Sequence, residues 1–328
     1  GLMGAGIIAA PAIVSRAAAA GLTPFNVGYD GFSITTGPMY YGLKKGIFKK
    51  YGLDLTITFL NDGTTLTQAI VGGSYGIGQN GYTPALAAAT RGADDVLIGG
   101  MSNKLPFQLT VKKELTNGPA LKGKKIAVTR MGASSDVALT YALRSLGLKR
   151  SDVIILQLGG EGNLMAALMS GQIDGCMIQM PRSAQLEEKG PFKILVDGTV
   201  VAKDYPNTAY VSRRSYLKDN GPIVKQFMMG ISDSIHQYKH DPVGGKALTA
   251  EFLKGPNDTA MARTYDLFVK HVFQDIPRPT LPGIQLVLND LAKTNPKAAS
   301  FKPQDLVDTT AIDTLVKEGF YKKLLSQA

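Results

Sequence analysis

The sequence predicts an α/β protein made of two similar lobes, and two observations carry this prediction. Short apolar segments alternate with stretches whose apolar residues recur at helical spacing, which is the pattern of a parallel sheet covered by helices. This alternation runs through the chain twice, with a first series starting near Val27 and a second at Lys125. Beyond residues 209–212 the chain reads as almost wholly helical. We therefore expect two Rossmann-like lobes, with the helical C-terminal part packed on lobe one.

The first series predicts the elements of lobe one. Helix residues 39–51 follow from the spacing of Tyr40, Leu43 and Ile47. Strands are expected at Val27, 55–59, Ile77 and 96–98, where apolar and β-branched residues gather.

The second series predicts lobe two. Strands are expected at 126–129, 153–158 and 176–180, with helices at 136–146 and 164–170. A capping residue precedes each helix, Ser134 or Ser135 for the first and Asn163 for the second, and a glycine follows each.

The division of the chain follows from this order. We assign residues 24–110 and 210–328 to lobe one and residues 111–209 to lobe two, so that the second lobe is inserted in the first. Chain crossings near 110–113 and 204–210 would act as two hinges, and two crossings allow the lobes to close like a clamp.

Polar turns follow the predicted strands of both lobes. In an open α/β sheet, ligands bind at the carboxyl ends of the strands, so these turns outline a binding crevice. Each turn alone would be an ordinary helix cap, Phe32 and Tyr82 could equally wall the core, and Arg182 could face solvent. From lobe one we expect ligand contacts from Asp30, Phe32, Ser33, Thr35, Thr64, Asn80 and Tyr82. From lobe two we expect them from Arg130, Ser134, Ser135, Asn163, Gln179 and Arg182.

Four segments carry a family resemblance. They are residues 42–54 (GLKKGIFKKYGLD), 81–93 (GYTPALAAATRGA), 121–128 (LKGKKIAV) and 171–175 (GQIDG). In this order they resemble the sulfonate-, nitrate- and thiamine-precursor-binding proteins of ABC importers, over roughly residues 24 to 325. Where many relatives carry Trp-Glu-Pro, this chain has Met180-Pro181-Arg182.

The resemblance implies a type II periplasmic-binding fold and a role in transport. We expect a monomeric solute-binding protein that captures a small ligand and presents it to an ABC permease in the inner membrane. Two alternatives stay open: a ligand sensor, and an enzyme on the same fold that resembles the aromatic sulfinate desulfinase or the fungal pyrimidine synthase. The desulfinase places its cysteine after the first strand, where this chain has residues 30–33, and the synthase has a cysteine-rich run that is absent here.

Composition narrows the ligand and partner classes. The 328 residues carry a formal net charge of +10, and no Lys/Arg block is longer than two residues, which argues against nucleic acid as a partner. We therefore expect an anionic organic ligand such as a sulfonate or a carboxylate, with Arg130 or Arg182 as its counter-charge. Trp is absent, so no Trp-lined sugar platform is available.

The first twenty residues read as a truncated signal peptide. Residues 2–14 are apolar and uncharged, and Ala18, Ala19 and Ala20 form a cleavage site before Gly21. Cys176 lies far from this point, so we expect a periplasmic protein without a lipid anchor.

Catalytic and metal chemistry find little support in the sequence. His236 and His240 share a helix face, but no Glu lies between them and Pro242 follows. Cys176 sits inside a predicted strand, with no His in its lobe to act as a base. We therefore expect a binding protein that is not an enzyme and has no metal or cofactor.

Overall fold

The computed structural model describes residues 21–202, 204–256 and 258–327. The expected signal peptide, residues 1–20, lies outside the described residues. Within the described part of the chain, no helix combines the length and the apolar character needed to cross a membrane.

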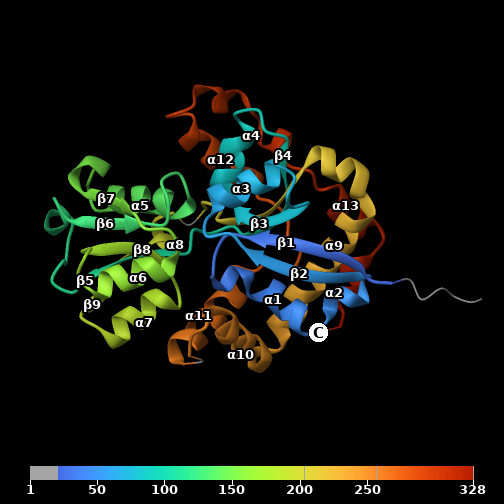
Figure 1. The fold of residues 1–328 in the computed structure, drawn as a ribbon, viewed down its shortest axis with the longest axis horizontal. Helices are drawn as coiled ribbons and strands as arrows, with labels where there is room; N and C mark the ends of the chain where they lie inside the picture. Colours follow the sequence, from blue (N-terminus) through green and yellow to red (C-terminus); the bar gives the residue numbers. More distant parts are fainter. Residues whose placement is uncertain (1–20, 203, 257, 328) are drawn as a thin grey trace, which may run out of the picture.

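Two five-stranded sheets form the two lobes (Figure 1). The first has the order β2-β1-β3-β10-β4, and the second has the order β7-β6-β8-β5-β9. The strands of the first sheet are β1 (Thr23–Tyr29), β2 (Leu53–Phe59), β3 (Ile77–Gly81), β4 (Asp95–Ser102) and β10 (Thr208–Arg213). Those of the second are β5 (Phe107–Lys112), β6 (Lys125–Val128), β7 (Ile154–Gln157), β8 (Gly175–Gln179) and β9 (Phe192–Asp197).

Helices cover both sheets. Lobe one begins with η1 (Ile34–Thr36), α1 (Gly37–Lys44), α2 (Ile47–Lys50), α3 (Gly63–Val71) and α4 (Tyr82–Ala89). Lobe two contains η2 (Pro119–Leu121), α5 (Ser134–Ser145), η3 (Arg150–Asp152), α6 (Glu161–Met169), α7 (Arg182–Lys189) and α8 (Gly198–Val201). The C-terminal part contains α9 (Arg214–His240), α10 (Pro242–Leu253), α11 (Thr259–His271), α12 (Leu281–Leu291), η4 (Pro296–Ser300), η5 (Pro303–Leu306), α13 (Thr310–Lys317) and α14 (Phe320–Leu325).

The C-terminal helices pack on the first lobe, as predicted. Helix α9 and helix α10 contact α1, while α12 contacts α4 (Figure 1). The architecture confirms the predicted α/β fold of two lobes.

The two sheets are mixed rather than wholly parallel. Strand β1 pairs in parallel with β2 and β3, but β10 runs antiparallel between β3 and β4. In the second sheet β6 is parallel to β7 and β8, but β5 runs antiparallel between β8 and β9. The antiparallel members are the strands that directly follow a chain crossing between the lobes.

The crossings themselves are short. The chain leaves the first sheet after Ser102 and enters the second at Phe107, and it returns between α8 and Thr208. The hinge predicted at 110–113 is therefore placed too late, because most of that segment belongs to β5 and pairs with β8 and β9. The segment 204–210 does overlap the second crossing.

The predicted helix 39–51 is interrupted. Gly46 has φ 70, a left-handed conformation that glycine adopts without the penalty other residues incur, and it separates α1 from α2.

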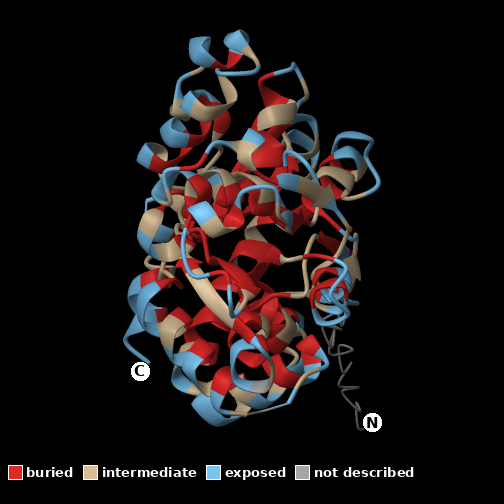
Figure 2. Cartoon of the chain, turned by 90° about the vertical axis from the view of Figure 1, so that its left-hand side faces the viewer, coloured by how far each residue is buried: buried red, intermediate tan, exposed pale blue. Residues whose placement is uncertain are grey.

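The apolar core is continuous between the lobes. One cluster of buried side chains includes Leu97 and Val211 of the first sheet together with Leu109 and Val128 of the second. Figure 2 shows this buried interior running through the middle of the molecule, with exposed residues at its periphery. This shared cluster packs against both sheets, while two further clusters lie within lobe one and within lobe two.

A tight contact between α1 and α9 gives a first test of the packing. A Cβ added at Gly42 would lie 1.9 Å from Oγ of Ser234 and 2.8 Å from a ring carbon of Phe48. Gly42→Ala should therefore lower the free energy of unfolding by about 1–3 kcal/mol, the range for overpacking a core. Gly221→Ala is the matched control, because no atom lies within 4 Å of its added Cβ. Urea unfolding should separate the two variants, and equal stabilities would contradict the packing of α1 on α9.

Candidate functional site

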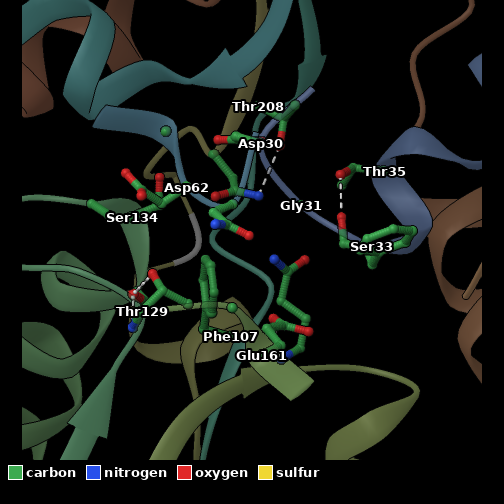
Figure 3. Close-up of a pocket in the computed structure, with 18 of the residues that line it drawn as sticks. Asp30, Gly31, Ser33, Thr35, Asp62, Phe107, Thr129, Ser134, Glu161 and Thr208 are labelled. Carbon is green, nitrogen blue, oxygen red and sulfur yellow. Dashed lines mark hydrogen bonds between the residues drawn. The ribbon is translucent and has the colours of Figure 1, made fainter. Parts of the chain in front are cut away.

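A cavity of about 300 Å³ lies where the carboxyl ends of the two sets of strands face each other. In Figure 3, Asp30 and Thr208 lie at its top, Phe107 and Glu161 at its bottom, and Ser33 and Thr35 to one side. The lining contains residues of both lobes. The predicted site residues among them are Asp30, Phe32, Ser33, Thr35, Ser134, Ser135, Asn163, Gln179 and Arg182.

Four predicted residues do not line this cavity. Asn80 and Tyr82 are fully buried: the amide of Asn80 bonds to Thr67 and Gly81, and the ring of Tyr82 belongs to the apolar core. Thr64 lies on a separate surface groove. Arg130 lies beside the cavity, where its Nε is 3.0 Å from Oδ2 of Asp62.

The lobe-one wall combines hydroxyls with aromatic rings. The hydroxyls of Ser33 and Thr35 lie 2.5 Å apart at the start of η1 (Figure 3). The rings of Phe32 and Phe59 pack with their centroids 4.4 Å apart, and both line the cavity. This wall offers a flat apolar face and adjustable hydrogen-bonding groups to one ligand.

Asp30 is a carboxyl group in the cavity wall, and its pKa is raised. Its Oδ2 accepts a hydrogen bond from the Gly81 N–H at 3.0 Å. Burial raises the pKa of Asp30 to about 7, with smaller contributions from the nearby carboxylates of Asp62 and Glu161, against the lowering effect of the Gly81 bond. Near neutral pH this group is therefore divided between a neutral donor and a charged acceptor.

Asp62 joins the two lobes. Its Oδ1 accepts from the N–H groups of Thr64 and Thr65, so it caps α3. Its Oδ2 pairs with Nε of Arg130 from the other lobe. This carboxylate is almost wholly buried, and the arginine is the charge that balances it.

Glu161 and Arg182 form a second junction between the lobes. Nη1 of Arg182 lies 2.9 Å from Oε2 of Glu161 and donates to the carbonyl of Phe32 in lobe one at 2.6 Å. Burial raises the pKa of Glu161, while Arg182 and the N–H of Gln179 oppose this shift. The guanidinium predicted to meet a ligand is thus already balanced by a carboxylate.

Gln179 contributes an unused acceptor. Its side chain is buried in the cavity wall, and its Oε1 has no hydrogen-bond partner among the described residues. A buried acceptor without a partner costs about 1–3 kcal/mol, which a ligand carrying a donor would recover.

The helix starts of lobe two differ in detail from the expected caps. Helix α5 has Ala133 as its N-cap, and Ser134 and Ser135 are its first helical residues. The hydroxyl of Ser135 bonds to Thr129 (Figure 3). Helix α6 begins at Glu161 instead of after Asn163, whose Nδ2 donates to the carbonyl of Leu158.

The two lobes approach closely at the start of α5. A Cβ added at Gly81 of lobe one would lie 2.7 Å from Oγ of Ser134 in lobe two. Glycine at this position therefore lets the side chain of Ser134 approach the lobe-one backbone beside the cavity.

Several residues that line the cavity have no clear signal in the sequence. Asp62 lies in the polar turn between β2 and α3, where the sequence indicates only a helix cap. Its ion-pair partner Arg130 is 68 positions away and leaves no local signal. Other such residues with side chains on the cavity are Phe59, Asn61, Phe107, Thr129, Glu161, Asn207 and Thr208. Phe107, Asn207 and Thr208 flank the chain crossings, so recognising the crossings would have pointed to them.

The groups weighed for catalysis or metal binding lie elsewhere. Cys176 is fully buried in β8, and burial raises the pKa of its thiol. His236 and His240 lie side by side on α9, with their ring centroids 4.4 Å apart and their planes tilted by 43°. Among the residues that the structure describes, no group of three His, Cys, Asp or Glu side chains is arranged to hold a metal ion.

Sequence relatives include both binding proteins and an enzyme. A candidate binding protein of Brucella abortus is 28% identical over 236 residues, which cover 70% of this chain and 72% of that protein. A candidate aliphatic sulfonates-binding protein of Escherichia coli is 29% identical over 177 residues, covering 52% and 54%. The 4-amino-5-hydroxymethyl-2-methylpyrimidine phosphate synthase THI5 of Saccharomyces cerevisiae is 24% identical over 224 residues, covering 63% and 64%.

Solved structures share the fold at low sequence identity. The alkanesulfonate-binding protein SsuA of Xanthomonas axonopodis, bound to MOPS, has a TM-score of 0.71 at 21% identity and covers 89% of this chain and 98% of its own. A ligand-binding component of an ABC-type import system from Staphylococcus aureus, with zinc bound, has 0.75 at 14%, covering 89% and 98%. The nitrate-binding protein NrtA of Synechocystis has 0.74 at 14%, covering 90% and 89%.

These pairwise similarities are too low to assign the chain to a family, but a family model does so. The model described as NMT1/THI5 like matches residues 34–244, which is more than half of the chain and includes most of the cavity lining. The chain belongs to the NMT1/THI5-like family.

Proposed function

We propose that this protein is the solute-binding component of an ABC importer and encloses a small organic acid between its two lobes. The observation that carries the proposal is the cavity itself, which is lined by polar groups of both lobes at the ends of their strands. A ligand that contacts both lobes stabilises their closed arrangement, because its binding energy is gained only when the lobes meet. The closed surface is then the signal that a membrane permease recognises.

The proposed location and partner are supported by the likeness to solved binding proteins of the same fold. The Xanthomonas and Staphylococcus neighbours are described as a sulfonate-binding protein and an import-system component. Their likeness supports delivery of a ligand to a permease, and the Synechocystis neighbour, described as periplasmic, supports an exported protein. We propose that it acts as a monomer in the periplasm and meets an inner-membrane permease.

The charge balance of the cavity supports an acid as the ligand. Arg130 and Arg182 neutralise Asp62 and Glu161, and Asp30 takes up a proton near neutral pH. The starts of α5 and α6 face the cavity through Ser134 and Gly162, and the N-terminus of a helix favours negative charge. With its own carboxylates balanced or protonated, the cavity can accept one further anionic group.

We propose binding without a chemical step. Cys176 is buried away from the cavity, and the cavity lining contains no histidine. These positions favour a binding protein over the activity named for the yeast relative.

The function is tested by a thermal-shift screen of small sulfonates, carboxylates and nitrate, with neutral and cationic analogues as comparison. A ligand present at 100 times its dissociation constant stabilises the folded protein by about 2.7 kcal/mol. Stabilisation by acids alone supports the proposal. Stabilisation only by amines or neutral molecules would reject the acid as ligand.

Binding of the acid should weaken as pH rises through about 7. Below this pH Asp30 is protonated and can donate to the anion, whereas above it the carboxylate repels the anion. Isothermal titration with the best acid from the screen should show an affinity loss of about tenfold between pH 5.5 and 8.5. Asp30→Asn should remove this pH dependence.

Asp95 provides the matched control for Asp30. Burial also raises the pKa of Asp95 to about 7, but this residue lies in β4 and does not line the cavity. Both groups bind a proton more tightly in the folded than in the unfolded chain, so each lowers stability as pH rises from about 4 to 7. Asp95→Asn should therefore raise the unfolding temperature at pH 8 and leave the pH dependence of ligand affinity unchanged. An identical effect of both variants on ligand affinity would exclude a direct role for Asp30.

Closure should depend on the two arginines that join the lobes. Small-angle scattering should show a smaller radius of gyration with saturating ligand than without it. In the double variant Arg130→Gln/Arg182→Gln, the unliganded protein should be more open, and ligand affinity should fall by about 1.5–3 kcal/mol. Arg150→Gln is the control, because Arg150 pairs with Asp136 within lobe two. A radius that ligand leaves unchanged, in wild type and double variant alike, would refute the clamp.

A further inference from the structure

A second cavity, of about 480 Å³, lies beside the ligand cavity and is called the outer cavity here. Lobe two contributes Met165 of α6 and Gln185 of α7, and lobe one contributes residues from the end of α10 and the start of α11. Figure 1 shows α7 and α11 on the same side of the molecule, at the boundary between the lobes. The outer cavity is therefore formed by the same two lobes that enclose the ligand cavity.

The two cavities share part of their lining. Phe32 and Arg182 line both of them. Arg182 donates to the Phe32 carbonyl and to Glu161, so its guanidinium stands at the boundary between the two spaces. A ligand that extends past this guanidinium would pass from one cavity into the other.

Gln185 offers an unused donor in the outer cavity. The residue is only 7% exposed, and its Nε2 has no hydrogen-bond partner among the described residues. This nitrogen lies 3.9 Å from the Cβ position of Gly255, another lining residue. A buried donor without a partner is costly, so the site favours an occupant with a hydrogen-bond acceptor.

Lys254, an exposed residue of the lining, adds a positive charge to the outer cavity. It ends α10 in a left-handed conformation, with φ 51, and its Nζ lies 6.0 Å from the ring centroid of Phe32. No ion pair of Lys254 occurs among the described residues, whereas Arg182 is paired with Glu161. The unbalanced charge of the outer cavity is therefore positive.

The remaining wall of the outer cavity is apolar. Thioether side chains adapt to the shape of what they contact, so they suit an aliphatic or aromatic segment. The apolar lining residues are Met165, Pro181, Leu253, Pro256 and Met261.

We propose that the outer cavity is a second compartment of the binding site, and that the ligand is an elongated organic diacid. One acid group occupies the ligand cavity, an apolar middle passes Phe32 and Arg182, and the second acid group meets Gln185 and Lys254. This inference rests on the proposed binding function and adds the length and the second charge of the ligand.

The test uses three probes: ethanesulfonate, hexane-1-sulfonate and hexane-1,6-disulfonate. In the full chain, the disulfonate should bind about tenfold or more tightly than the monosulfonate of equal length, as expected for one added charge-assisted hydrogen bond. Gln185→Leu and Lys254→Met should remove this difference and leave ethanesulfonate affinity unchanged. Gln185→Glu, which places a negative charge at the same position, should reverse the preference.

Two controls separate the compartment from an effect on folding or on surface charge. Lys317→Met removes an exposed lysine on α13 and should preserve the preference for the disulfonate. With methyl-labelled methionine, the resonances of Met165 and Met261 should shift with the six-carbon probes and stay in place with ethanesulfonate.

The outcomes distinguish this inference from the function on which it rests. If ethanesulfonate binds and the two six-carbon probes bind equally, the outer cavity is only an opening to solvent, and the diacid is rejected while the binding function stands. If none of the three probes binds, the diacid is rejected, and the binding function is decided by the thermal-shift screen of sulfonates, carboxylates and nitrate. A disulfonate preference that survives Gln185→Leu and Lys254→Met also overturns the inference.

Discussion

The burial of three carboxyl groups between the two sheets is the constraint on which the site depends. An ionised carboxylate held away from water needs a partner, and removing that partner costs about 3–5 kcal/mol. Here Asp62 and Glu161 are balanced by Arg130 and Arg182, while burial raises the pKa of Asp30 to about 7. The Arg130–Asp62 pair and the Arg182–Phe32 contact both cross from one lobe to the other. The electrostatic balance of the cavity is therefore complete only when the lobes are together.

Much of the fold could be predicted from the sequence, because the elements with a strong local hydrophobic pattern are enough to define the two α/β lobes. Strands β1 and β2 include the expected positions, Val27 and 55–59, and the chain after Arg213 is almost wholly helical, as expected. Strands β5 and β9 could not be predicted. Their pairing partners are each other and β8, and pairing across such distances in the chain leaves no local signature. For this reason the hinge predicted at 110–113 falls within β5.

Of the residues in the site, only those near the carboxyl ends of predicted strands could be predicted from the sequence. Ser33, Ser134 and Gln179 were found because polar residues after a strand converge at one edge of a sheet. Asn80 and Tyr82 satisfy the same rule, but their side chains turn into the core, where Thr67 and the apolar cluster hold them. The sequence reads Arg182 as a free cation, whereas in the structure it is engaged with Glu161. Charge in a sequence can be counted, but its pairing depends on the folded arrangement.

The insertion of lobe two between β4 and β10 sets the order in which the molecule can be assembled. As the chain is synthesised, β4 has no partner in its sheet until β10 arrives, after residues 103–207 have been made. Closing so long a loop while it is flexible costs more entropy than closing a short one, and it delays the pairing that depends on it. Folding of the second sheet removes this obstacle, because β5 and β9, which stand near the two ends of the inserted segment, are adjacent strands. The first sheet therefore cannot be complete before the segment of lobe two has been made, and neither can the cavity, which Thr208 of β10 lines.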